Sequence, residues 1–267
     1  MAQMETLPWQ LKLVEKSIKK KQKLHLILNT LADDGQRKAL ELGTSQGSLG
    51  YFFRQKGGFW VHADEDLANL LEAKNLLKTN LIQLEGSRLP FLSHSFDLVI
   101  SPDYLEHLEN DELCLREIAR ILKPGGQAII VTPHTGPGNF LYKLRLWLGL
   151  KPEFYGHKRD GYNYLQLENL LERTGLKPER RVIISRLFSE SLELWLNLIY
   201  IHFLSRPRKI ELRDGHIRPM SHQEFKAARP WLGFYSLIYP FFWLASRLDN
   251  LISFSPGYLL IVWARKK

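Results

Sequence analysis

At 267 residues the chain can bury the core of one large domain, and its content of 45% hydrophobic and 24% charged residues excludes an intrinsically disordered protein. The single cysteine, Cys114, excludes an internal disulfide framework, and the first ten residues lack the apolar core of a signal peptide, so we expect a cytoplasmic protein. The formal net charge of +9 is compatible with plain solubility and also with nucleic acid, an anionic membrane or an acidic substrate as partner.

Short apolar segments alternate with amphipathic ones through the first half of the chain. Apolar residues at helical spacing predict a helix over residues 10–31. Buried strands are expected at 38–43, 59–64, 81–86, 96–101 and 127–133. Helices fill the intervals, and the segment KPGG (123–126) is typical of a helix stop. This alternation indicates βαβ units and a parallel sheet covered by helices on both faces.

The pattern changes after Pro133. Residues 134–163 are irregular and rich in Gly, Pro and aromatic residues, and a helix is expected at 164–175. Strands are expected at 180–188 and 257–266. About seventy residues separate these two strands, far more than a hairpin needs. We therefore expect them to lie side by side and antiparallel at one edge of the sheet, with a long excursion between them.

The segment LELGTSQGSLG (40–50) ends the first strand and turns on glycines. A phosphate loop would need a Gly-Lys-Ser/Thr ending, and a dinucleotide fingerprint would need a closer first pair than Gly43 and Gly47. Asp64 ends the second strand about twenty residues later, where a carboxylate can accept hydrogen bonds from both hydroxyls of a ribose. The loop and this acid together predict a ligand that contains a nucleoside.

Further motifs follow in order between residues 38 and 133: LEGSRLPF (84–91), FDLVIS (96–101), LEHL (105–108) and ILKPGG (121–126). With the glycine loop and Asp64, they resemble the class I S-adenosylmethionine-dependent methyltransferases, especially the group that includes ubiquinone-biosynthesis and related small-molecule or lipid methyltransferases. The resemblance implies S-adenosylmethionine as cofactor. It also implies a Rossmann-like α/β fold with seven mostly parallel strands in the order 3-2-1-4-5-7-6 and helices on both faces.

The resemblance also implies positions for the cofactor. Residues around the methionine end would be Glu41, Gly43, Ser45 and Gly47, and Asp64 would bind the ribose. Ser87 and Leu89, with Pro90 and Phe91, would line the adenine. Two positions depart from the family pattern, because Ser45 stands where the family has its middle glycine and Ser87 stands where it usually has an acid. Both departures bear on cofactor affinity, because a serine hydroxyl accepts more weakly than a carboxylate.

Methyl transfer from a sulfonium is an in-line displacement, and a hydroxyl acceptor must also lose a proton. His107 in LEHL and His157 in FYGHKRDGYN are the candidate catalytic residues, since histidine exchanges protons near neutral pH. The alternative for each is an ordinary loop residue. Tyr104 and Tyr162 are weaker candidates as residues of the pocket wall. The sequence shows no paired-cysteine or His-x-x-x-His spacing, so no metal site is predicted.

We expect three parts: an N-terminal helical segment (1–35), a methyltransferase domain (36–188 with 257–267) and an aromatic-rich helical insertion (189–256). The insertion holds two apolar stretches, 190–204 and 232–254, which polar residues and Pro240 make unsuitable as membrane spans. It is interpreted either as a lid over a greasy substrate or as a peripheral membrane surface. Nucleic acid is not favoured as partner, because the basic residues there flank apolar surface rather than a stripe of stacking aromatics.

The leading hypothesis is therefore a methyltransferase that acts at oxygen or carbon on a small-molecule or lipid-linked acceptor, at the membrane surface if the insertion is an interface. An RNA or protein methyltransferase and a cofactor-binding scaffold without activity are the alternatives. The sequence does not determine the acceptor or the oligomeric state.

Overall fold

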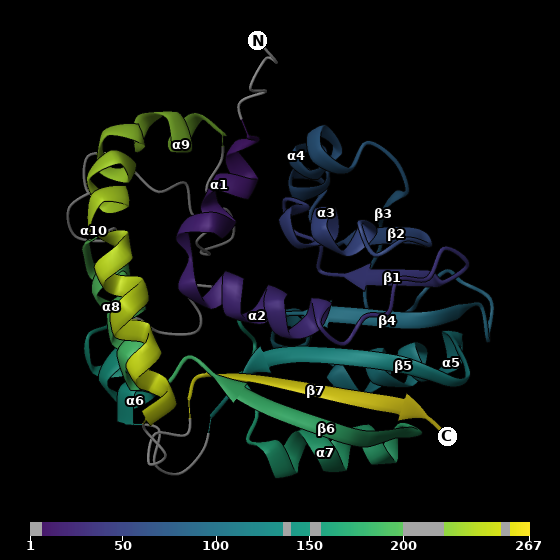
Figure 1. Cartoon of the computed structure of the whole chain (residues 1–267). Helices are drawn as coiled ribbons and strands as arrows, with labels where there is room; N and C mark the ends of the chain where they lie inside the picture. Colours follow the sequence, from purple (N-terminus) through teal and green to yellow (C-terminus); the bar gives the residue numbers. More distant parts are fainter. Residues whose placement is uncertain (1–6, 136–139, 150–155, 200–221, 252–256) are drawn as a thin grey trace.

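The computed structural model describes residues 7–135, 140–149, 156–199, 222–251 and 257–267. Its centre is a seven-stranded sheet in the order β3-β2-β1-β4-β5-β7-β6, as predicted (Figure 1). The strands that run parallel to one another are β1 (Lys38–Leu42), β2 (Phe59–Asp64), β3 (Leu81–Gln83), β4 (Phe96–Pro102) and β5 (Leu122–Pro133).

The last two strands close one edge of the sheet. β7 (Leu259–Lys266) runs antiparallel to β5 and to β6 (Leu176–Ile184), so it lies between them. Arg181 of β6 lies opposite Val262 of β7. The expected antiparallel neighbours are therefore found side by side, and the sheet has the mixed arrangement that the family resemblance implies.

Helices cover both faces of the sheet and bury two separate apolar clusters. On one face, α1 (Trp9–Lys16), α2 (Ile18–Leu28) and α3 (Ser48–Arg54) pack around Trp60 and Trp263. On the other, α5 (Asp111–Ile121) and α7 (Tyr164–Arg173) pack against Leu40 and Val262. α4 (Leu67–Leu77) contacts β2 and β3. The strands alternate their side chains between the two clusters, which explains their nearly continuous apolar sequences.

The N-terminal helix expected at 10–31 is two helices. Ser17 has extended backbone angles (φ −102°, ψ 117°), and its side chain accepts a hydrogen bond from the backbone N–H of Lys20. A serine at this position caps the start of α2 and competes with a continuous helix. The apolar spacing carried no sign of this break.

The strand expected at 180–188 lies four residues earlier, because α8 (Leu187–Ile199) begins where that strand was expected to end. The Asp249 carboxylate accepts hydrogen bonds from the backbone N–H groups of Arg186, Phe188 and Ser189. These N–H groups at a helix start need acceptors, and a carboxylate also complements the helix dipole. A residue about sixty positions away therefore fixes the boundary.

Other boundaries differ by smaller amounts. β3 ends at Gln83 rather than at residue 86, and β5 begins at Leu122, before the KPGG segment, with a register shift against β4. A short helix, α6 (Phe140–Trp147), lies in the segment expected to be irregular.

Helices α8, α9 (His222–Ala227) and α10 (Arg229–Arg247), with the short 3₁₀ helix η4 (Leu248–Leu251), occupy the chain between β6 and β7. They lie at the side of the molecule toward which the parallel strands point (Figure 1). Pro240, which the sequence analysis counted against a membrane span, does not interrupt α10; it lies inside the helix and is exposed. None of the described helices is both long and apolar enough to cross a bilayer. The ends of the two apolar stretches, with His202, fall outside the described residues.

Candidate cofactor and acceptor site

The loop after β1 has left-handed backbone angles at three positions: φ is 77° at Gly43, 50° at Ser45 and 80° at Gly47. A Cβ at Gly43 would lie 3.0 Å from Tyr104, and one at Gly47 would lie 3.0 Å from Leu77. The two glycines are therefore required both by conformation and by space. Ser45 also has a left-handed backbone (φ 50°) although it carries a side chain, at the position where the family pattern has a glycine.

Glu41 lies beneath this loop rather than on its surface. Its side chain is fully buried, and its Oε2 accepts a hydrogen bond of 2.7 Å from the Thr44 hydroxyl and lies 2.7 Å from Nδ1 of His62. α3 passes so close that a Cβ at Gly50 would lie 2.4 Å from that oxygen. Glu41 thus holds the glycine loop through Thr44. Sequence reasoning missed His62, whose position within an apolar strand gave no sign of a partner.

Asp64 ends β2 directly beside the loop. Its carboxylate accepts hydrogen bonds from the backbone N–H of Ser45 (2.7 Å), the backbone N–H of Asp66 (3.0 Å) and the Asn69 side chain (3.1 Å). Burial raises the pKa of Asp64, against the lowering effect of these three donors. The structure therefore brings together the predicted ribose acid and the predicted loop.

On the expected adenine side, Ser87 donates a hydrogen bond to the Glu85 carboxylate (2.9 Å). The acid that faces this turn is Glu65, which accepts from the Tyr104 hydroxyl (2.6 Å) and the backbone N–H of Gly86 (3.4 Å). Glu65 follows Asp64 directly in the sequence, but the sequence analysis did not select it. It places a carboxylate beside the turn in which Ser87 replaces the usual acid.

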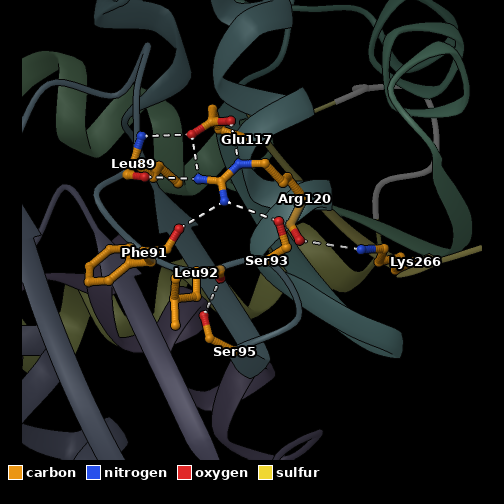
Figure 2. A network of polar contacts seen from close by, with 8 residues as sticks. All are labelled: Leu89, Phe91, Leu92, Ser93, Ser95, Glu117, Arg120 and Lys266. Atoms are coloured by element: carbon orange, nitrogen blue, oxygen red, sulfur yellow. Dashed lines mark hydrogen bonds and ion pairs between the residues drawn. The ribbon is translucent and has the colours of Figure 1, made fainter.

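The Leu89–Ser95 segment is held by α5. Arg120 donates hydrogen bonds to the carbonyls of Leu89 and Phe91 and pairs with Glu117, which in turn accepts from the backbone N–H of Leu89 (Figure 2). Pairing with Arg120 lowers the pKa of Glu117. The Leu89 side chain is only 2% exposed and packs in the core. This network therefore fixes the backbone of the proposed adenine wall.

His107 and His157 are fifty residues apart in the sequence but lie together. Their rings are perpendicular, with centroids 4.8 Å apart, and Nδ1 of His107 lies 3.1 Å from the Gly156 carbonyl. Burial, with a smaller contribution from the neighbouring His107, lowers the pKa of His157 to about 4, so His157 is neutral at physiological pH. The fully buried carboxyl of Glu106 lies beside them, and burial raises its pKa to about 8. Of the two histidines, His107 is the better candidate base.

The two tyrosines have structural partners. The Tyr104 hydroxyl donates to Glu65, and the Tyr162 hydroxyl donates to Asp111 at 2.5 Å. Burial and these carboxylates raise the pKa of both phenols, which remain protonated at physiological pH. They can shape the pocket but are poor proton acceptors.

Ion pairs that the sequence gave no means of predicting join the N-terminal segment to this region. Lys23 of α2 pairs with Asp103, which directly follows β4. Buried Glu190 of α8 pairs with Lys19 of α2 (2.9 Å) and with Arg145 of α6 (2.6 Å). Helices from three separate parts of the chain therefore meet around buried Glu190.

Comparison with known proteins finds similar sequences and similar folds. Residues 40–130 match the family model described as a methyltransferase domain. The demethylmenaquinone methyltransferase of Mycobacterium tuberculosis is 32% identical over 87 residues, which are 33% of this chain and 37% of that protein. An uncharacterized protein of Methanocaldococcus jannaschii, MJ1123, is 31% identical over 135 residues, or 51% of this chain and 60% of that one. The chain thus spans about a third to three-fifths of the length of these relatives.

Solved structures share the fold across most of the chain. An S-adenosylmethionine-dependent methyltransferase from Archaeoglobus fulgidus superposes with a TM-score of 0.58 at 14% identity, covering 96% of this chain and 94% of that one. The [4+2]-cyclase SpnF superposes with a TM-score of 0.59 at 15% identity, covering 92% and 81%. At such identities the likeness concerns the fold alone. Together with the sheet order, it shows the fold that these methyltransferase structures share, and residues 40–130 match a methyltransferase domain.

Proposed function

We propose that the protein transfers a methyl group from S-adenosylmethionine to a small-molecule or lipid-linked acceptor, at oxygen or carbon. One observation carries the proposal: two arrangements occur together at the carboxyl ends of the strands. The backbone N–H of Ser45 donates a hydrogen bond to Asp64, and His107 after β4 contacts His157 after β5. The first arrangement suits a ribose and the methionine end of the cofactor. The second suits an acceptor that must lose a proton.

The cofactor supplies an electrophilic methyl group on its sulfonium. On this proposal, Asp64 holds the ribose hydroxyls, the Gly43–Gly47 turn follows the methionine end, and Glu65 with the Ser87 turn borders the adenine. His107 takes the proton of a hydroxyl acceptor, while neutral His157 and the two tyrosines orient it. The ion pairs of Lys23 and Lys19 keep α2 over the acceptor end and exclude water from it.

A lipid-like acceptor is supported by the outer face of α10 and η4. Large apolar side chains at helical spacing are exposed there: Leu237 (71%), Phe241 (72%), Leu244 (63%), Leu248 (43%) and Leu251 (81%). We call these five residues the outer stripe. A contiguous apolar face of this kind marks a binding surface on a globular protein.

The surroundings of the outer stripe favour a membrane as its partner. Arg247 lies over the ring of Trp243, 4.5 Å from its centroid, at the border of the stripe. Aromatic and basic side chains beside an apolar helix face suit the headgroup region of an anionic bilayer. The relative that methylates demethylmenaquinone, by its name, acts on a lipid-like acceptor. We therefore propose that the insertion at 189–256 docks the domain of 36–188 and 257–267 on a membrane surface.

Activity is tested with labelled S-adenosylmethionine. The full chain is first titrated with S-adenosylhomocysteine by calorimetry, and labelled methyl transfer is then measured into membrane and polar extracts, with the product identified by mass spectrometry. Labelled product in the organic phase would support a lipid-linked acceptor. Labelled product in the polar phase would instead indicate a small polar acceptor. Absence of S-adenosylhomocysteine binding would overturn the proposed function.

Membrane docking is tested by sedimentation with vesicles of phosphatidylcholine and phosphatidylglycerol. Leu237→Ser with Leu244→Ser should weaken sedimentation at least tenfold, because burial of one leucine side chain contributes about 1.5–3 kcal/mol. The matched control is Leu92→Ser, since Leu92 is 82% exposed on a different element. Salt should weaken but not abolish binding, because ions screen the basic residues and not the apolar term. No sedimentation at low salt would favour a closed lid instead.

A further inference from the structure

A cluster of one carboxyl and two imidazole groups lies at the acceptor end of the site. Glu106 and His107 belong to the 3₁₀ helix η1 (Leu105–His107) after β4, and His157 lies in the connection after α6. One potential ligand atom of each lies within 4.8 Å of the others. The sequence analysis predicted no metal site, because these residues do not share a local spacing.

The two segments of the cluster are fixed to each other by backbone contacts. The backbone N–H of Lys158 donates to the Glu106 carbonyl at 2.8 Å, and Nδ1 of His107 lies 3.1 Å from the Gly156 carbonyl. Because a carbonyl only accepts, Nδ1 of His107 carries the proton, and the lone pair of a neutral ring is then on Nε2. Such a contact to a backbone carbonyl is the usual outer partner of a metal-binding histidine.

Glu106 shows the clearest need for a ligand. Its side chain is fully buried, and Oε2 accepts from the Thr132 hydroxyl at 3.3 Å. Oε1 has no hydrogen-bond partner among the described residues. The nearby cation Lys23 is paired with Asp103. A buried polar oxygen without a hydrogen-bond partner is costly, so Oε1 of Glu106 lacks an evident counterpart.

We propose that Glu106, His107 and His157 bind a divalent transition-metal ion. Two imidazole nitrogens and one carboxylate oxygen form a donor set that suits zinc, manganese or iron, and three protein ligands leave a position open for another oxygen. This step rests on the proposed function: the further oxygen ligand is the hydroxyl of the methyl acceptor. A bound ion would lower the pKa of that hydroxyl so that its proton passes to water; the oxygen then forms a bond to the methyl carbon as the carbon–sulfur bond breaks and S-adenosylhomocysteine leaves. In the metal-bound form His107 would serve as a ligand, and water would take its place as the proton acceptor.

The test uses full-length protein stripped of metal with a chelator and titrated with zinc chloride by calorimetry, with metal content measured separately. We expect one zinc ion per chain. Glu106→Gln and His157→Asn should each weaken zinc binding at least tenfold. His94→Asn is the matched control, since His94 is exposed in a turn outside the cluster, and it should bind as the wild type does. Wild-type protein without stoichiometric zinc, or ligand variants that bind like the control, would overturn the inference.

S-adenosylhomocysteine titrations of the same variants separate this inference from the proposed function. Retained S-adenosylhomocysteine affinity shows that a variant is folded, and two substitutions in different segments keep the test decisive if one variant does not fold. Magnesium chloride should bind much more weakly than zinc, because magnesium prefers oxygen ligands. Methyl transfer that is unaffected by complete chelation would overturn the metal role alone, whereas failure to bind S-adenosylhomocysteine would overturn the function beneath it.

Discussion

The sheet region from β1 to β5 and the helical excursion from α8 to η4 differ in where they place apolar side chains. Those of β4 lie in the core, whereas the outer stripe of the excursion faces solvent. In β4 six of the seven residues are buried, and helices cover both faces of the strand. In α10, Tyr239 and Ser246 face inward, whereas the outer stripe faces solvent. Burial within the chain therefore accounts for the apolar residues of β4 but not for those of the outer stripe. The excursion thus exposes an apolar surface in addition to packing on the domain.

The largest expected effect contrasts one leucine from each region. Leu115→Ala removes a fully buried side chain from the core beside β4 and should lower the free energy of unfolding by about 3–5 kcal/mol. Leu244→Ala, at a side chain that is 63% exposed, should change it by less than about 0.5 kcal/mol. Urea unfolding followed by circular dichroism measures both. A large loss for Leu244→Ala would mean that the outer stripe is needed for folding.

The next largest effect is on cofactor affinity, which we expect to depend on the sheet region and not on the excursion. Asp64→Ala should weaken S-adenosylhomocysteine binding by about 1.5–3 kcal/mol for each ribose hydrogen bond to the carboxylate that is lost. Leu244→Ser, in the excursion, should leave that affinity unchanged, and calorimetry compares the two variants. Unchanged affinity of Asp64→Ala would remove the ribose assignment, and reduced affinity of Leu244→Ser would mean that the two regions are coupled.

A smaller effect concerns the packing of α3 on the buried Glu41–His62 pair. Gly50→Ala would place a Cβ 2.4 Å from the Glu41 carboxylate and 2.7 Å from His62. Overpacking of this kind should cost about 1–3 kcal/mol of unfolding free energy. At Gly35 a Cβ meets no atom within 4 Å, so Gly35→Ala is the control and should be close to neutral. Equal stabilities of the two variants in urea would show that α3 can shift away from the pair.

The sequence was most informative where local pattern and burial agree. The strand order, the position of the glycine loop beside Asp64 and the antiparallel final pair all follow from alternating elements and family motifs. The pairing of His107 with His157 was not predicted as a contact, although both residues were selected singly. The loops that carry His107 and His157 are brought together by the order of the strands in the sheet, which residue type alone does not predict.

The missed features depend on contacts between distant residues. Asp249 sets the start of α8, Lys23 pairs with Asp103, and Glu190 joins three helices, each across at least forty positions of sequence. A charged residue in a polar segment looks like a solvated one until its partner is known. The outer stripe was visible as hydrophobic sequence, but its direction depends on which face of α10 packs inward.

The smallest effect compares two serines with left-handed backbones, one in the cofactor loop and one directly before the excursion. φ is 50° at Ser45 in the cofactor loop and 57° at Ser185 before α8. A side chain in this conformation costs about 1–2 kcal/mol, whereas glycine adds about 0.5–1 kcal/mol of unfolded-state entropy. Ser45→Gly should therefore raise the free energy of unfolding by up to about 1 kcal/mol.

Ser185→Gly should not stabilise the protein, because the buried Ser185 hydroxyl donates to the Glu190 carboxylate at 3.0 Å. Loss of a hydrogen bond to a charged group costs about 1.5–3 kcal/mol, which offsets the relief of backbone strain. Urea unfolding of both variants at one pH measures the difference. If Ser45→Gly proved destabilising, the Ser45 side chain would have to make a stabilising contact of its own, and the serine in the family's glycine position would then be a functional substitution rather than a tolerated one.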